Sequence, residues 1–249
     1  MARWHEVAEA LRGAITAGIY QPGAKIPKED ELQEEFDTSR TTIRRAVAQL
    51  TAEGLLTPVR RGGTKVREQP ERQSLALDTA VYRDELGYYF SKTVQHLRAL
   101  QPPTVTQEPC PPDVLALLGL QAGDHVIIRD RVMGNSETGR VEQLATSYLP
   151  ADLAAGTVLA QADTGPGGIY DRMENELGWG LLEWEGIITA RPATAEEGDL
   201  LSLAPGVPVL CVTRSTIATA GAAEGRVVEV NVTRRDASRF EVRYPISRA

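Results

Sequence analysis

The stretch Asp37-Thr38-Ser39-Arg40-Thr41-Thr42-Ile43-Arg44-Arg45-Ala46-Val47 decides how the first third of this chain folds. Asp37-Thr38 forms a short turn between two helical patterns, and Ser39 is a typical N-cap for the second helix. The apolar residues of this second helix recur at three- and four-residue spacing and so share one face: Ile43, Ala46, Val47 and Leu50. The pattern predicts two helices joined by a tight turn, the second ending near Glu53.

The flanking segments extend this unit in both directions. Residues 4–17 have apolar residues at helical spacing and end at Gly18, and residues 28–36 form a second helix with acids in its first turn. Residues 55–59 and 64–67 are two short strands around Arg60-Arg61-Gly62-Gly63. We therefore expect a winged helix-turn-helix DNA-binding domain over residues 1–68.

The charge distribution points to a nucleic-acid partner. The chain has 249 residues and a net charge of −7, yet residues 38–67 hold seven Lys or Arg and one acid, Glu53. A basic patch in an acidic protein suits a phosphate backbone. Arg40, Thr41 and Arg44 lie opposite the apolar stripe, at the helix end that faces base edges in such domains.

Further candidate DNA contacts surround these three residues. Hydroxyl groups and basic side chains can bind phosphates, and glycines at the tip of the wing allow it to approach a groove closely. The residues of this kind are Thr38, Ser39, Thr42, Arg45, Arg61, Gly62 and Gly63. The alternative is that the arginines only solvate an exposed helix face, and for Arg45 the two interpretations are equally favoured.

Residues 69–75 are polar, contain Pro70 and are the expected linker to a second domain over residues 76–249. The second domain has predicted strands at 126–133, 141–148, 207–216 and 227–233, with helices at 112–118 and 171–177. Strands interspersed with helices favour an α+β fold with an antiparallel sheet.

Two features of the second domain suggest an anion site. A glycine-rich loop, including Gly167 and Gly168, precedes a helix that begins near Ile169, and free N–H groups at a helix start attract anions. Arg129 and Arg131 are two apart on one strand, so both can face one ligand. The loop could instead be only a tight turn, and the arginines surface ion pairs.

Other function classes receive little support. Cys110 and Cys211 lack metal or disulfide spacing, and the three histidines form no catalytic or metal set, so we expect no metal, no cofactor and no enzyme. Because the sequence shows neither the apolar core of a signal peptide nor an apolar run long enough to span a membrane, we expect a cytoplasmic protein with no membrane partner. Trp179 and Trp184 are expected in the core or its rim, although stacking on a ligand is the alternative.

The first third resembles the GntR family of bacterial transcription regulators. The matching motifs are Ala8-x-x-Leu11-Arg12-x-x-Ile15, Pro22-Gly23-x-x-Ile26-Pro27, Ser39-Arg40-Thr41-Thr42-Ile43-Arg44-x-Ala46 and Glu53-Gly54-Leu55. The resemblance implies a homodimer on an inverted-repeat operator, with Arg40, Thr41, Thr42 and Arg44 contacting double-stranded DNA. Many relatives have Arg where this chain has Asp30, and Lys28 is expected to substitute for it.

The second domain resembles the UTRA effector domain of the HutC-type GntR branch. The anchors are Leu118-Gly119-Leu120-x-x-Gly123, Val126-x-x-Arg129-x-Arg131, Ser147-Tyr148-Leu149-Pro150, Gly167-Gly168-Ile169-Tyr170, Leu200–Leu203, Val209-Leu210-x-Val212-x-Arg214, and Glu229 with Arg239-Phe240. The resemblance implies a fold similar to chorismate lyase that binds ligands without chemistry. Effectors in this branch include sugar phosphates, amino-acid catabolites and fatty acids.

The same resemblance assigns candidate effector-binding residues. Arg129, Arg131, Gly168, Tyr170 and Glu229 match positions that line the family's effector site; Gly167 and Asn231 are candidates beside them. For Glu229 and Asn231, plain solvated strand positions are the alternative. This chain departs from its relatives at Ala145, where Glu is frequent, at Gly168, where Ser is common, and at Arg235, where an aromatic residue is common.

These observations predict a sequence-specific transcription regulator, a repressor, whose operator binding responds to a small anionic effector. The alternative is a DNA-binding regulator whose C-terminal domain only dimerises and senses no ligand.

Overall fold

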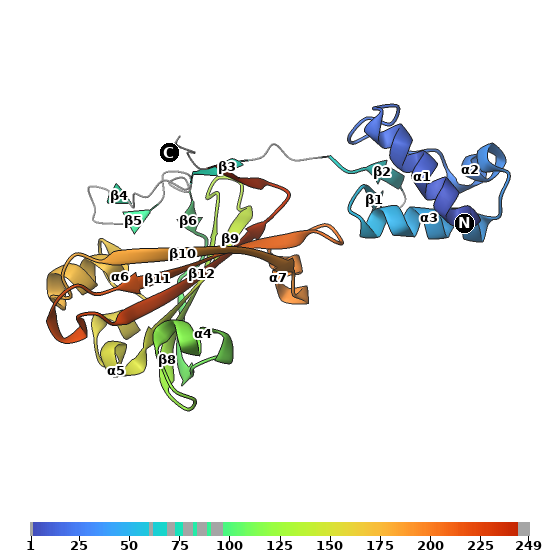
Figure 1. Ribbon diagram of the computed structural model, residues 1–249. Coiled ribbons are helices and arrows are strands. Elements are labelled where there is room, and N and C mark those ends of the chain that lie inside the picture. Colours follow the sequence, from blue (N-terminus) through green and yellow to red (C-terminus); the bar gives the residue numbers. More distant parts are fainter. Residues whose placement is uncertain are drawn as a thin grey trace, which may run out of the picture. The chain divides into compact units, whose positions relative to one another are not determined.

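The computed structural model describes residues 2–59, 62–68, 73–76, 82–83, 89–90 and 97–243. The chain forms two compact units, one built mainly from residues 1–71 and the other mainly from residues 72–249 (Figure 1). Within the described residues, no helix is long and apolar enough to cross a membrane.

The first unit is the expected winged helix-turn-helix. Its elements are α1 (Arg3–Thr16), α2 (Glu29–Phe36), α3 (Arg40–Ala52), β1 (Leu56–Val59) and β2 (Gly63–Val66). The predicted apolar faces form one core, which includes Leu11, Leu32, Ile43 and Leu50, each at most 1% exposed. β1 and β2 pair antiparallel and form the wing strands.

Local chemistry fixes the turn between α2 and α3. Asp37 adopts the left-handed conformation, with φ of 41°, which Asp tolerates better than most residues. Ser39 is the N-cap of α3, and its hydroxyl accepts a hydrogen bond from the Thr42 backbone N–H at 3.3 Å. The turn and the cap therefore lie where the sequence predicts them.

A seven-stranded antiparallel sheet forms the second unit, which confirms the α+β fold. The strands are β6 (Arg98–Ala99), β7 (Thr104–Pro109), β8 (His125–Gly134), β9 (Val141–Pro150), β10 (Glu183–Pro192), β11 (Pro208–Ile217) and β12 (Val227–Asp236). The strand order is β10-β11-β12-β9-β8-β6, and β7 also pairs with β8. The long strands of this sheet run side by side in Figure 1.

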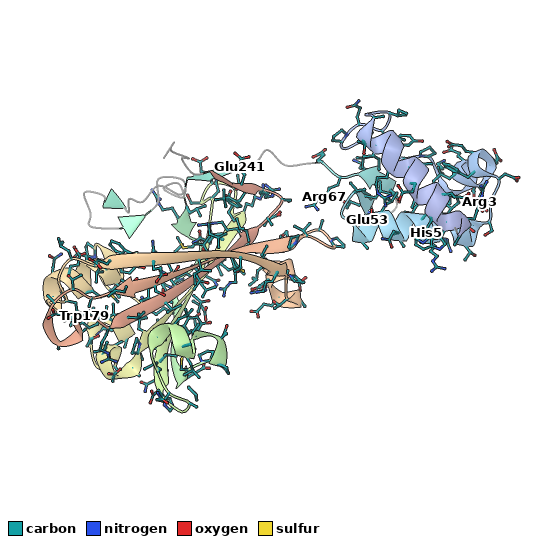
Figure 2. The ribbon with its side chains drawn as sticks, in the orientation of Figure 1. Arg3, His5, Glu53, Arg67, Trp179 and Glu241 are labelled. Atoms are coloured by element: carbon teal, nitrogen blue, oxygen red, sulfur yellow. The ribbon has the colours of Figure 1, made fainter. Side chains whose placement is uncertain are left out.

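Helices cover both faces of the sheet. The helical elements are α4 (Pro112–Leu118), α5 (Ala151–Ala154), η2 (Val158–Ala160), α6 (Gly168–Asp171), η3 (Arg172–Glu176), α7 (Ala195–Leu200) and η4 (Gly221–Ala223). Val114 and Leu118 of α4 pack against Val126 and Val230 on one face. Ile127 and Leu149, which point to the other face, join a core with Trp179. Trp179 is labelled in Figure 2. The core placement of Trp179 agrees with the sequence analysis.

Two local features differ from the sequence analysis. The helix expected at 171–177 begins at Gly168, and its second part, η3, is a π-helix in which the Leu177 N–H donates to the Arg172 carbonyl at 2.9 Å. β3 (Gln73–Ala76) pairs in parallel with β13 (Phe240–Arg243), so a strand begins inside the stretch expected to be linker. Residues 69–72 of that stretch lie outside the described residues. A separate two-stranded pair joins β4 (Tyr82–Arg83) and β5 (Tyr89–Phe90).

Candidate functional sites

The exposed face of α3 presents Arg40, Thr41 and Arg44 as predicted. A glutamate of α2, Glu29, binds the two arginines. The Glu29 carboxylate accepts the Nε–H of Arg40 at 2.6 Å and the Nε–H of Arg44 at 3.0 Å. The Arg44 and Arg40 hydrogen bonds lower the pKa of Glu29. The hydrogen bonds to Glu29 use the Nε–H groups, and base contact by the terminal N–H groups of both guanidiniums stays a prediction.

The hydroxyl residues at the start of α3 have local roles as well. The Ser39 and Thr42 hydroxyl oxygens lie 3.0 Å apart, and both residues shape the first turn of the helix. The Thr38 backbone N–H donates to the Gln33 carbonyl at 3.2 Å. These bonds leave the Ser39 hydroxyl exposed at the helix start, where a phosphate oxygen can accept from it.

Arg45 has a partner that the sequence analysis did not consider. Its guanidinium lies 4.5 Å from the ring centroid of Trp4, a cation–π contact between α3 and α1. Trp4 in turn stacks on His5, labelled in Figure 2, with ring centroids 3.6 Å apart. Arg45 therefore does more than solvate the helix, and its role as a phosphate contact remains a prediction.

The remaining DNA candidates lie on α2 and the wing. Lys28 is exposed, and its backbone N–H donates to the Glu31 carboxylate at 2.7 Å. A Cβ atom on Gly62 would lie 2.6 Å from Cγ1 of Val59, and Gly63 has φ of +81°, so the tight wing turn requires both glycines. Arg61 lies outside the described residues.

In the second unit, one row of directly paired residues across four neighbouring strands places four polar side chains on the same sheet face. Arg129 of β8 pairs with Ser147 of β9, Ser147 with Asn231 of β12, and Asn231 with Arg214 of β11. In the next row Glu229 pairs with Thr216. We call the residues Arg129, Arg131, Ser147, Tyr170, Arg214, Thr216, Glu229 and Asn231 the polar cluster.

Arg129 is buried at 3% exposure, and backbone oxygens surround its guanidinium. It donates to the carbonyls of Leu159 at 2.8 Å, of Ala162 at 3.2 Å and of Gln161. Burial and then the nearby Arg131 charge lower the pKa of Arg129 to about 10. Arg129 therefore connects the sheet to the 159–162 segment. This arginine is not part of a surface ion pair, and in this arrangement it is not free to contact a ligand.

Arg131 and Asn231 converge on Ser147. A terminal N–H of Arg131 donates to the Ser147 hydroxyl at 2.6 Å, and the Asn231 side chain donates to the same oxygen at 2.9 Å. The Nε atom of Arg131 is buried and has no hydrogen-bond partner within the described residues. Asn231 is 6% exposed, which excludes a plain solvated position.

Glu229 is fully buried and accepts two hydrogen bonds on one oxygen. The Tyr170 hydroxyl donates to its Oε2, and the Thr216 hydroxyl donates to the same oxygen at 2.9 Å. Burial raises the pKa of Tyr170 to about 12, so this hydroxyl stays protonated. Among the described residues nothing pairs with the other Glu229 oxygen, Oε1. A buried carboxylate oxygen without a partner is costly in a folded protein.

Arg214 is a cluster member that sequence reasoning did not assign. Its terminal N–H donates to the Tyr170 hydroxyl at 2.7 Å, and its guanidinium lies 5.3 Å from the Tyr170 ring centroid. Its buried Nε has no partner in the described part of the chain. Arg214 belongs to one anchor of the UTRA resemblance, but only the pairing of β11 with β12 shows that it is the direct partner of Asn231.

The glycine-rich loop has a structural explanation of its own. Gly167 and Gly168 have φ of 87° and 69°, which favours glycine, and Arg172 donates to the carbonyls of Thr164 and Pro166 at 2.8 Å each. α6 begins at Gly168, next to the expected Ile169, and continues into η3; an anion site at this helix start stays a prediction. The loop's role is to deliver Tyr170 into the polar cluster, and the tight-turn alternative explains the two glycines.

No group of three or more His, Cys, Asp or Glu that could hold a metal occurs in the described ranges. Cys110 and Cys211 are buried free thiols, and burial raises the pKa of both. The polar cluster instead offers hydrogen bonds and charge to a small molecule.

Comparison with known families decides the identity of both units. Residues 4–66 match the model of bacterial regulatory proteins of the gntR family, and residues 103–241 match the UTRA domain. The chain is 30% identical to an HTH-type transcriptional regulator from Streptomyces coelicolor over 97% of this chain and 91% of that protein. The chain belongs to the GntR family.

Similar proteins extend over both units of this GntR protein. The HTH-type transcriptional repressor NagR of Bacillus subtilis is 27% identical over 88% of this chain and 86% of its own length. A crystal structure of a GntR-family transcriptional regulator is 26% identical, with a TM-score of 0.71 over 100% of this chain and 99% of that one. Both resemblances inferred from the sequence, to GntR and to UTRA, are thereby confirmed.

Proposed function

We propose that this GntR protein is a repressor that binds an inverted-repeat operator as a homodimer and releases it when a small anionic effector occupies the polar cluster. The observation that supports this most strongly lies in the polar cluster, where three buried atoms have no hydrogen-bond partner among the described residues: Arg131 Nε, Arg214 Nε and Glu229 Oε1. A domain that only dimerised would gain stability from apolar residues at these positions.

The DNA half of the proposal rests on α3. Arg40 and Arg44 are exposed at its N-terminal end, where the recognition helix of such domains meets the major groove. The related NagR of Bacillus subtilis is named a repressor, which supports the direction of regulation. Coupling requires that the effector bind more tightly to the form with low DNA affinity.

Fluorescence anisotropy with the DNA upstream of the protein's own gene tests the proposal. We expect tight, salt-dependent binding to this duplex, weak binding to a scrambled duplex, and weaker operator binding when pools of small metabolites are added. Equal binding to both duplexes would count against an operator at this location. Operator affinity that no metabolite pool changes would favour the alternative in which the UTRA domain only dimerises.

A further inference from the structure

The polar cluster has an excess of positive charge on one sheet face. Arg129, Arg131 and Arg214 belong to the cluster, and Arg235 of β12 lies on the same face, two rows beyond Asn231. Within the described residues, Glu229 is the carboxylate that accepts hydrogen bonds in the cluster. Three guanidiniums therefore lack a carboxylate of their own in a buried setting, where unpaired charge is most costly.

Two of the four arginines are already satisfied by neutral groups. Arg129 donates to three backbone carbonyls, and Arg235 donates to the Gln143 side chain through Nε, at 2.9 Å, and a terminal nitrogen. Burial and then the Arg214 charge lower the pKa of Arg235 to about 10, and its guanidinium also lies 5.4 Å from the Phe240 ring centroid. Arg131 and Arg214 are the two that keep a buried Nε–H without a hydrogen-bond partner among the described residues.

These two arginines mark opposite ends of the cluster. Arg131 is on β8 and Arg214 on β11, and the strand order places β9 and β12 between them. Three strand spacings separate their backbones by about 14 Å. Within the described ranges, each end has one buried Nε–H without a hydrogen-bond partner.

The residues between the two ends are suited to the middle of a ligand. Ala145 pairs directly with Arg131, so a methyl group stands where a longer side chain could neutralise that guanidinium. Glu229 Oε1 is a buried acceptor without a donor in the described part of the chain. A hydroxyl or ammonium group is the donor that this oxygen lacks.

We propose that the effector is a small acid with anionic groups at both ends and a hydroxyl or ammonium group between them. One acidic group binds Arg131 with Ser147 and Asn231, the other binds Arg214, and the central donor binds Glu229 Oε1. Charge-assisted hydrogen bonds at two separated points select for length as well as charge. This inference rests on the proposed function and specifies the ligand class of its effector site.

A panel of diacids and their monoamides tests the inference on the full-length protein. Glutamate with glutamine, malate with its monoamide, and succinate with succinamate differ by one charge at nearly constant shape. Binding is followed by calorimetry and by the effect on operator anisotropy. We expect at least one hydroxy or amino diacid to bind about tenfold or more tightly than its monoamide, which corresponds to ~1.4 kcal/mol.

Two variants and a control locate the ends of the ligand. Arg131→Gln and Arg214→Gln are each expected to remove the discrimination between diacid and monoamide, bringing the affinity ratio close to one. Arg140→Gln, at an exposed position in the β8–β9 connection, is the charge-matched control and should keep the wild-type ratio. Thermal unfolding of each variant checks that the fold is retained.

The outcomes separate this inference from the proposed function. Monoamides that bind as well as diacids would overturn the two-ended class, and so would a diacid preference that survives both Arg131→Gln and Arg214→Gln. If no diacid binds while a metabolite with a single anionic group weakens operator binding, the inference fails and the proposed function stands. If no compound of either kind changes operator affinity, both fail.

Discussion

Glu29 offers the sharpest test of how the DNA-reading helix works. Its carboxylate fixes the Nε–H groups of Arg40 and Arg44, two arginines on the exposed face of α3. Glu29→Gln removes the charge while keeping the side-chain length. We predict that this change lowers discrimination between operator and random DNA, although Glu29 itself need not touch a base.

The magnitude follows from the entropy of the two arginines. Ordering a free Arg side chain costs up to ~2 kcal/mol, and a fixed Nε–H removes about half of that freedom. For two arginines the lost preorganisation is about 2 kcal/mol, or roughly a 30-fold fall in the ratio of specific to non-specific affinity. Stability should change by less than ~1 kcal/mol, because these ion pairs are solvent-exposed.

Anisotropy with operator and scrambled duplexes measures this ratio. Asp30→Asn is the matched control: it removes one acid from the same helix, and the Asp30 carboxylate accepts from Gln33, at 3.2 Å. Asp30→Asn should raise both affinities together by weakening charge repulsion and leave the ratio unchanged. An unchanged ratio in Glu29→Gln, or an equal fall in both variants, would refute the orienting role.

Three further predictions concern other residues. Arg44→Ala should lose roughly 1–3 kcal/mol of operator binding, and an equal loss on random DNA would reveal a phosphate contact instead. Glu197, buried in α7 and bonded to Arg191 at 2.7 Å, has a pKa lowered to about 2, mainly by that arginine, from its ordinary value of 4.5. The free energy that the ionised Glu197 adds to folding is therefore complete above pH 4.5 and is lost as the pH falls towards 2. Urea unfolding should show Glu197→Gln to be ~2 kcal/mol less stable than wild type at neutral pH. The difference in unfolding free energy between the two proteins should become smaller in acid. Arg129→Gln should cost about 2–4 kcal/mol in unfolding free energy, because buried carbonyls lose their donor; a cost below ~0.5 kcal/mol would show that the 159–162 segment does not need it.

The helix-turn-helix could be predicted from sequence because its signals are local. The Ser39 cap, the stripe from Ile43 to Leu50 and the glycines of the wing act within a few residues of one another. The pairing of Glu29 with Arg40 and Arg44 could not be foreseen, because it depends on how α2 packs across α3. Sequence alone therefore predicted the candidate DNA contacts on α3 but not the carboxylate that binds two of them.

The effector domain shows the limits of the sequence more clearly. The i, i+2 spacing correctly placed Arg129 and Arg131 on one sheet face, but the acceptors of Arg129 lie some thirty residues away at 159–162. Arg214 joined the cluster only through the register of β11 with β12. β10 was missed because Glu183–Pro192 is an edge strand with mostly exposed residues and no clean apolar alternation.

The central claim is that this GntR protein reads a specific inverted repeat through α3. Selection of bound duplexes from a random-sequence pool, with wild type and with the Arg40→Ala/Arg44→Ala double variant in parallel, tests it most directly. We predict one enriched inverted repeat for wild type and none for the double variant. The same repeat enriched by both proteins, or no enrichment by wild type, would contradict it.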